Sequence, residues 1–269
     1  MNKENNVLTV KTVSTTPIRA MITALKDILT DATITFTAQG LKIINFDKTH
    51  TTLVNVNLYA DRFEEYICIP EKIIICANTH HLFKVISTMS NDDILSIYIE
   101  KNDYHDGIVS ELGFQYDNGD IKQCYSQKLR LLDADTEEML VPDVEYSTII
   151  NLPTAYFQKI IRDLNGISDR VEIRSVGNDL IFSCEGSFAK SNIKRTEADG
   201  NLEFVKKADA SIVNQGEFSL KSLSNFIKCS PLCTHLEIYL GNNLPLIVKY
   251  HVASLGEIKL CLAPLPPSV

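Results

Sequence analysis

The sequence predicts an α+β protein built from two similar domains, and three observations lead to this. The chain has 269 residues, 45% of them hydrophobic, which is enough to bury one large core or two medium ones. Four segments carry apolar residues at helical spacing, and each is followed by a segment or hairpin that is typical of strands. The order of these elements in the first half of the chain repeats in the second half, which indicates an internal duplication.

The four expected helices span residues 17–29, 78–89, 154–165 and 219–231. Pro17 suits the first turn of the first helix, and Asn78 or Thr79 would cap the second. Leu25, Leu82, Ile160 and Leu223 each belong to the apolar face of one helix. Residues 32–37 with 41–46, 93–100, 170–175 with 180–185, and 235–240 with 244–252 are the expected strands. These elements predict an N-terminal domain over 1–130, a connector over 131–145 and a C-terminal domain over 146–269.

The connector has an unusual composition. Residues 131–146 read LLDADTEEMLVPDVEY, with six acidic residues, no basic residue and several large apolar ones. They show neither strand alternation nor a helical period, and Pro142 would interrupt a helix. A solvated linker needs fewer apolar residues than this, so the presence of Met139, Leu140 and Val141 requires another explanation.

The overall composition excludes several classes of protein. The apolar runs are short and broken by charge, so no membrane span and no secretory signal are expected. Seven scattered cysteines without a CxxC pair suit a reducing, intracellular compartment and argue against a disulfide framework or a zinc ribbon. The formal net charge of −8 disfavours nucleic acid as a partner when it is taken alone.

The distribution of the charges points the other way. The four helical segments carry seven basic residues against only Asp27 and Asp163, so the acidic excess lies on the strands and loops. Basic side chains often serve only to keep a helix face soluble, but four such faces together favour contact with a phosphate backbone without base reading. The basic residues are Arg19, Lys26, Lys84, Lys159, Arg162, Lys221 and Lys228.

No arrangement of residues predicts catalysis. Asp47 and His50 in DKTH have no third partner for a nucleophilic or metal site, and the adjacent His80 and His81 diverge on a helix. The chain contains no Walker A motif, dinucleotide-binding glycine loop or HExxH motif. We therefore expect neither an enzyme nor a metal or other cofactor.

Several long stretches resemble proliferating cell nuclear antigen (PCNA), the sliding clamp of DNA replication. They are ALKDILTDATITFTAQGL, FDKTHTTLVNVNL, LVPDVEYS, FQKIIRDLNGISDRVEI, SNIKRT, NFIKCSPL and LPLIVKYHVASLGEIKLCLAP. The resemblance implies the DNA clamp fold and a head-to-tail homotrimeric ring around duplex DNA. It implies a processivity factor that a clamp-loader ATPase places on DNA and that tethers DNA polymerase and repair proteins. Such a protein would act in the nucleus or at a viral replication site.

The resemblance also assigns residues to three surfaces. It turns the seven helix cations toward DNA, and it joins the strand near Ile121–Tyr125 to the strand near Phe188–Lys194 of the next subunit, with Ser191 and Ile193 in the contact. A pocket for partner peptides would use Phe46, His50, Met139, Val141, Pro245, Ala263 and Pro264. The resemblance implies that such peptides insert a short helical turn with one aliphatic and two aromatic side chains. Cys261 and Thr51 depart from the residues common in relatives, which leaves the peptide preference open. Two alternatives remain at this point: a subunit of a checkpoint-type or heterotrimeric clamp, and an adaptor scaffold that does not encircle DNA.

Overall fold

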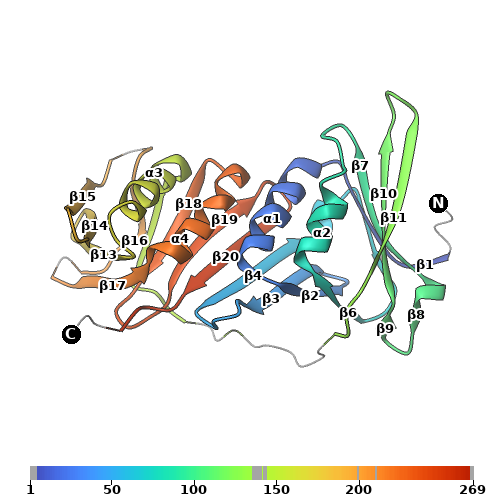
Figure 1. Ribbon diagram of the computed structural model, residues 1–269, viewed down its shortest axis with the longest axis horizontal. Coiled ribbons are helices and arrows are strands. Elements are labelled where there is room, and N and C mark those ends of the chain that lie inside the picture. The colour runs from blue at the N-terminus through green and yellow to red at the C-terminus, as the bar shows by residue number, and fades with distance from the viewer. Residues whose placement is uncertain (1–4, 135–140, 142–143, 199, 210, 267–269) are drawn as a thin grey trace. The chain divides into compact units, whose positions relative to one another are not determined.

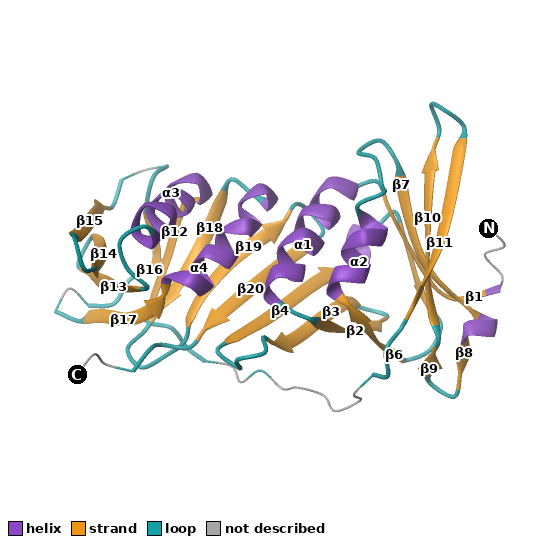
Figure 2. Ribbon diagram, viewed as in Figure 1, coloured by secondary structure: helices purple, strands orange, loops and turns teal. Residues whose placement is uncertain are grey.

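The computed structural model describes residues 5–134, 141, 144–198, 200–209 and 211–266 (Figures 1 and 2). The chain divides into two compact units. The first comprises Met1–Lys48, Val54–Leu140 and Val252–Ile258, and the second comprises Thr49–Leu53, Val141–His251 and Lys259–Val269. Each unit thus takes in a short piece from the other half of the chain. Among the described residues, no helix has the length and apolar character needed to cross a membrane.

The first unit contains two antiparallel sets of strands and a pair of helices. One sheet has the order β11-β10-β7-β1-β5, and the other set runs β4-β3-β2-β6. Helices α1 (Thr15–Ile28) and α2 (Thr79–Ile86) lie side by side. The strands are β1 (Asn6–Thr12), β2 (Asp31–Thr37), β3 (Gly40–Phe46), β4 (Thr52–Tyr59), β5 (Glu65–Cys68), β6 (Lys72–Asn78), β7 (Ile94–Glu100), β10 (Glu111–Asn118) and β11 (Gln123–Arg130), with a small hairpin of β8 (Tyr104–His105) and β9 (Ile108–Val109).

The second unit repeats this plan. Its strands follow the orders β16-β12-β18-β19-β20 and β15-β14-β13-β17. Helix α3 (Thr154–Asn165) contacts α4 (Leu220–Phe226) and the 3₁₀ helix η4 (Ile227–Leu232) that continues it. The strands are β12 (Thr148–Pro153), β13 (Arg170–Val176), β14 (Asp179–Glu185), β15 (Lys190–Thr196), β16 (Glu203–Lys206), β17 (Val213–Ser219), β18 (His235–Leu240), β19 (Leu246–Val252) and β20 (Gly256–Leu262).

Each helix pair covers the core of its unit. Ile18 and Leu25 of α1 and Leu82 of α2 are almost fully buried, as are Phe157 of α3 and Leu223 of α4. These are the residues at helical spacing in the sequence, so the amphipathic pattern predicted the buried face correctly. Burial of such side chains stabilises each unit by about 1.5–3 kcal/mol per residue.

The internal repeat extends to the register of the strands. In the first unit, Asp31 pairs with Asn78 and Thr33 with Cys76. In the second, Arg170 pairs with Ser219 and Glu172 with Glu217. Asn78 and Ser219 are the N-caps of α2 and α4, and each accepts a hydrogen bond from the backbone N–H three residues on. The two units therefore match residue by residue around their second helices.

Three expected elements differ from the structure. The second helix ends at Ile86 rather than at residue 89, and the fourth ends at Phe226 before η4 begins. Lys228 therefore lies in η4, whose tighter winding breaks the spacing expected for one α-helix from Lys221. Ile121 lies in the turn before β11 rather than in the strand.

Gly40 is held in a conformation that a side chain rarely adopts. Its φ is +142°, and a Cβ at this position would lie 2.0 Å from the carbonyl oxygen of Leu58. Gly40→Ala is therefore expected to lower the free energy of unfolding by about 3 kcal/mol or more, measured by urea denaturation followed by circular dichroism.

Gly177 provides the matched control for this prediction. Its φ is +55°, but a Cβ there would meet no atom within 4 Å. Gly177→Ala should lower the free energy of unfolding by about 1–2 kcal/mol, which is the cost of holding alanine in a left-handed backbone conformation. Equal losses from the two substitutions would contradict the steric explanation for Gly40.

Candidate functional site

Six of the seven helix cations lie in α-helices and fall into two groups, and the seventh, Lys228, is exposed in η4. Lys84, Lys159, Arg162 and Lys221 are exposed, and none of them forms an ion pair among the residues described. They come from α2, α3 and α4. Four cations without carboxylate partners on amphipathic helices leave positive charge available for an external anion.

The two cations of α1 are engaged within the first unit. Arg19 donates to the backbone oxygen of Met89 at 2.9 Å and also to the side chain of Asn91. Lys26 pairs with Asp27 at 2.8 Å and lies over the ring of Phe83, 4.9 Å from its centroid. Both side chains therefore help to hold α1 against its neighbours, a role that the sequence did not reveal.

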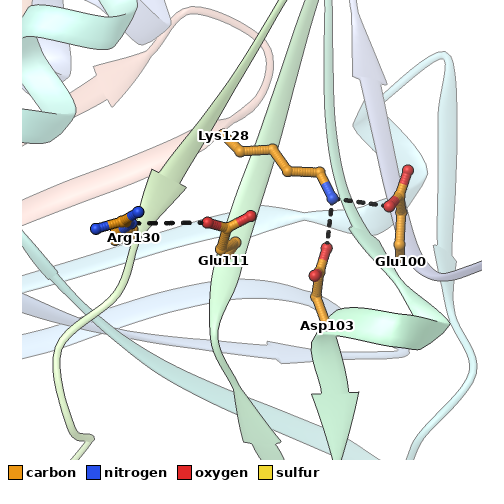
Figure 3. Close-up of polar contacts among 5 residues, drawn as sticks. All are labelled: Glu100, Asp103, Glu111, Lys128 and Arg130. Atoms are coloured by element: carbon orange, nitrogen blue, oxygen red, sulfur yellow. Dashed lines mark hydrogen bonds and ion pairs between the residues drawn. The ribbon is translucent and has the colours of Figure 1, made fainter.

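Lysines and arginines on the strands are mostly paired with carboxylates. Figure 3 shows Lys128 of β11 between Glu100 and Asp103, at 2.7 and 2.8 Å. The hydrogen bonds that Lys128 donates to Asp103 and Glu100 raise its pKa, so it stays charged. Arg130 of the same strand lies 3.9 Å from Glu111. The β11 cations are thus compensated inside their own unit.

The second unit shows the same pairing. Lys190, Lys194, Lys206 and Lys207 each lie 2.7 Å from a carboxylate, namely Glu185, Asp179, Glu145 and Glu197. The hydrogen bond from Lys194 holds the pKa of Asp179 below its usual value. These cations of the second unit are paired with carboxylates, whereas the four exposed cations of α2, α3 and α4 are not, so those helices carry positive charge that remains available.

Most residues of the expected peptide pocket belong to the second unit. Val141, Pro245, Ala263 and Pro264 are exposed there, and the backbone N–H of Ala263 donates to the oxygen of Thr51 at 2.9 Å, next to His50. Phe46 ends β3 in the first unit and is 40% exposed. Met139 lies outside the described residues.

Two groups near these residues are fixed by hydrogen bonding or burial. The hydroxyl of Tyr146 donates to the backbone oxygen of Pro245 at 2.8 Å, and its ring packs edge-on against Tyr239. Burial raises the pKa of Tyr146 to about 12 and that of the Cys261 thiol to about 11. Cys261 is therefore a neutral thiol at physiological pH, where it offers a small apolar surface.

The two expected subunit edges are outer strands of their sheets. β11 is the first strand in its order and β15 the first in its own, so each has one side without a partner strand among the residues described. Phe188, in the turn before β15, is 75% exposed, while Ile121 and Tyr125 are 66% and 44% exposed. Ser191 and Ile193 lie in β15. Apolar side chains beside an open strand edge are a typical basis for strand-to-strand assembly.

The sequence did not reveal the residues that cover two other outer strands, β6 and β17. Leu132 donates its N–H to Cys76 of β6 at 2.8 Å, and Leu265 donates to Glu217 of β17 at 2.7 Å. Both donors lie in irregular chain after a final strand, where no periodic signal exists. Leu131 also donates its N–H, to the oxygen of Ser110 at 3.1 Å, so Leu131 and Leu132 attach the start of the connector to the first unit.

Two α+β units, each with a helix pair over antiparallel strands, define the DNA clamp fold. Residues 7–138 match the family model of the N-terminal domain of proliferating cell nuclear antigen, and residues 140–265 match that of its C-terminal domain. The chain therefore belongs to the PCNA family.

One relative extends the similarity over the whole length. The probable DNA polymerase sliding clamp 1 of Paramecium bursaria Chlorella virus 1 is 33% identical over 270 residues. The alignment covers 98% of this chain and 99% of the relative. The match spans both units and the segment between them.

Proposed function

We propose that this chain is a DNA polymerase sliding clamp: three copies form a closed ring that encircles duplex DNA and carries polymerase along it. The ring acts as a scaffold without catalysis of its own. It takes its place on DNA through a clamp-loader ATPase and serves both replication and repair. Similarity to a viral clamp supports a viral replication site as the place of action, with the nucleus as the alternative.

The observation that carries this proposal is the contrast between the helix and strand cations. Lys84, Lys159, Arg162 and Lys221 keep their charge available, whereas the strand cations described above are neutralised by nearby carboxylates. Free cations on helices suit contact with phosphates of any sequence. Because a ring holds DNA by enclosure, these contacts need not be strong, and weak contacts permit sliding.

Assembly would use the open strand edges. The edge of β11 in one subunit would join the edge of β15 in the next, which gives a head-to-tail contact that closes after three copies. The side chains of Tyr125, Phe188 and Ile193 would supply the apolar part of this contact.

The direct test is polymerase extension on a primed circular template with a clamp loader and ATP. Adding the purified chain should lengthen the products of a single binding event, and cutting the template should abolish this gain because a ring slides off free ends. Equal stimulation on cut and circular templates would contradict encirclement. A chain that is monomeric by light scattering would contradict the homotrimer and favour a heterotrimeric clamp.

Val141 allows a test of the partner pocket. Its side chain is 38% exposed, so Val141→Asp should leave the fold intact while placing a charge in an apolar docking surface. We expect polymerase stimulation to fall about tenfold or more, in the range of an interface hot spot. Val144→Asp is the matched control, because Val144 is 41% exposed in the same stretch of chain. Equal loss in both variants would contradict a specific role for Val141.

A further inference from the structure

A short irregular segment follows β11 and another follows β20, and each covers an outer strand of a sheet. We call residues 131–134 the connector strap and residues 263–266 the C-terminal strap. The connector strap bonds to Cys76 of β6 and the C-terminal strap to Glu217 of β17. Cys76 and Glu217 occupy equivalent positions, each two residues before the N-cap of the second helix. The duplication thus produced the same edge-covering contact twice.

The C-terminal strap has few groups with which to hold its position. Its sequence is Ala-Pro-Leu-Pro, and proline has no backbone N–H, so only Ala263 and Leu265 can donate. Both N–H groups are already used, by the oxygens of Thr51 and Glu217. Ala263, Pro264 and Pro266 are exposed, and the strap forms one side of an open groove, so burial contributes little to fixing it.

Arg170 supplies a further contact at this point. Its Nη1 donates to the backbone oxygen of Pro266 and to Oε2 of Glu217, both at 3.3 Å. Glu217 is also the residue whose backbone oxygen receives the Leu265 N–H. One guanidinium group therefore joins the far end of the strap to the strand beneath it.

No equivalent guanidinium contact occurs at the matched position among the described residues of the first unit. The residue equivalent to Arg170 is Asp31, since Asp31 pairs with Asn78 as Arg170 pairs with Ser219. Asp31 accepts a hydrogen bond from the side chain of Asn78 at 3.0 Å, within its own strand pair. A carboxylate cannot donate to a strap carbonyl, so the two units differ in chemistry at a matched position.

We propose that Arg170 is a positioning residue that fixes the C-terminal strap on β17 and thereby sets the place of Ala263 and Pro264 for partner peptides. The part that concerns peptides rests on the function proposed above. Removing the guanidinium leaves the strap attached only through Ala263 and Leu265, so its last residues gain freedom. A peptide that docks on Ala263 and Pro264 must then restore their order at a cost in affinity.

The test compares Arg170→Ala and Arg170→Lys with the unmodified trimer by hydrogen exchange and peptide binding. In Arg170→Ala, the Leu265 amide should exchange roughly fivefold faster, as expected for loss of a partly exposed charged hydrogen bond. Binding of a fluorescent peptide with one aliphatic and two aromatic anchors should weaken about threefold. Lysine has one flexible cationic group, so Arg170→Lys should restore part of both losses.

Arg62→Ala serves as the control. It removes the same side chain from an exposed ion pair with Asp61 in the first unit, and it should change neither readout. Unchanged Leu265 exchange in Arg170→Ala would overturn the fastening role. Faster exchange with unchanged peptide affinity would overturn the positioning role. If the unmodified chain bound no such peptide, the proposed docking surface would fail, and the exchange data would still decide whether Arg170 fastens the strap.

Discussion

Phe188→Asp is expected to convert the trimer into monomers. The side chain is 75% exposed in the single chain and stands beside the open edge of β15, where the proposed ring buries it. A carboxylate placed there would lose its hydration without gaining a partner, and an aromatic anchor would be lost as well. A penalty of about 2 kcal/mol per contact weakens each of the three subunit contacts about 30-fold. Size-exclusion chromatography with light scattering should report the monomer mass.

Ile108→Asp is the control for this result. Ile108 is 73% exposed, almost the same as Phe188, but it lies in the β8–β9 hairpin, which is not one of the two expected subunit edges. This variant should stay trimeric, and the circular dichroism spectra of both variants should match that of the unmodified chain because neither side chain is buried in the single chain. If Phe188→Asp remained trimeric at micromolar concentration, the assignment of this edge would be wrong.

The second large effect concerns DNA. The double variant Lys159→Ala, Arg162→Ala removes two exposed cations of α3 that have no acidic partner among the described residues. If each neutralises one phosphate, the slope of log affinity against log salt should become shallower by about 1.8. Fluorescence anisotropy with a labelled duplex at several salt concentrations measures this slope, and retention on circular DNA after loading should shorten in parallel.

A matched double variant separates local contact from total charge. Lys206→Ala, Lys207→Ala also removes two cations from the second unit, but both are paired with carboxylates on strands or loops. It should leave the salt slope unchanged. Equal changes in the two double variants would mean that only net charge matters, and the helices would lose their special role.

Helices were predictable where one face is buried and the other is not. Residues 154–165 form α3 with the bounds that the periodicity predicted, because Phe157, Ile160, Ile161 and Leu164 recur on one side. The sequence of β1 shows no periodic pattern of this kind. Val7, Leu8, Thr9 and Val10 are all buried, so the alternation of apolar and polar residues that marks a half-exposed strand is missing. A strand covered on both sides looks like any short apolar run.

The candidate site was predictable in composition but only partly in geometry. The sequence indicated which helices carry cations, yet it could not show that Arg19 and Lys26 are held by Met89, Asn91 and Asp27. Nor could it show that Arg170 contacts Pro266, because 96 residues separate them. Such contacts depend on how distant segments meet, which no local pattern encodes. The division into an N-terminal domain over 1–130, a connector over 131–145 and a C-terminal domain over 146–269 remains a prediction. The two compact units of the structure each include a short segment from the other half of the chain.

The pairing of the strand cations bears on where the proposed clamp attracts DNA. Lys128 between Glu100 and Asp103, and Lys194 beside Asp179, offer a passing duplex little net attraction. With a net charge of −8, the remaining surface repels phosphate at distances up to the Debye length of about 8 Å at physiological salt. Unproductive adsorption to the outside of the molecule is thereby disfavoured. A polyanionic partner is therefore attracted more by the exposed cations of α2, α3 and α4 than by strand cations that already have a carboxylate partner.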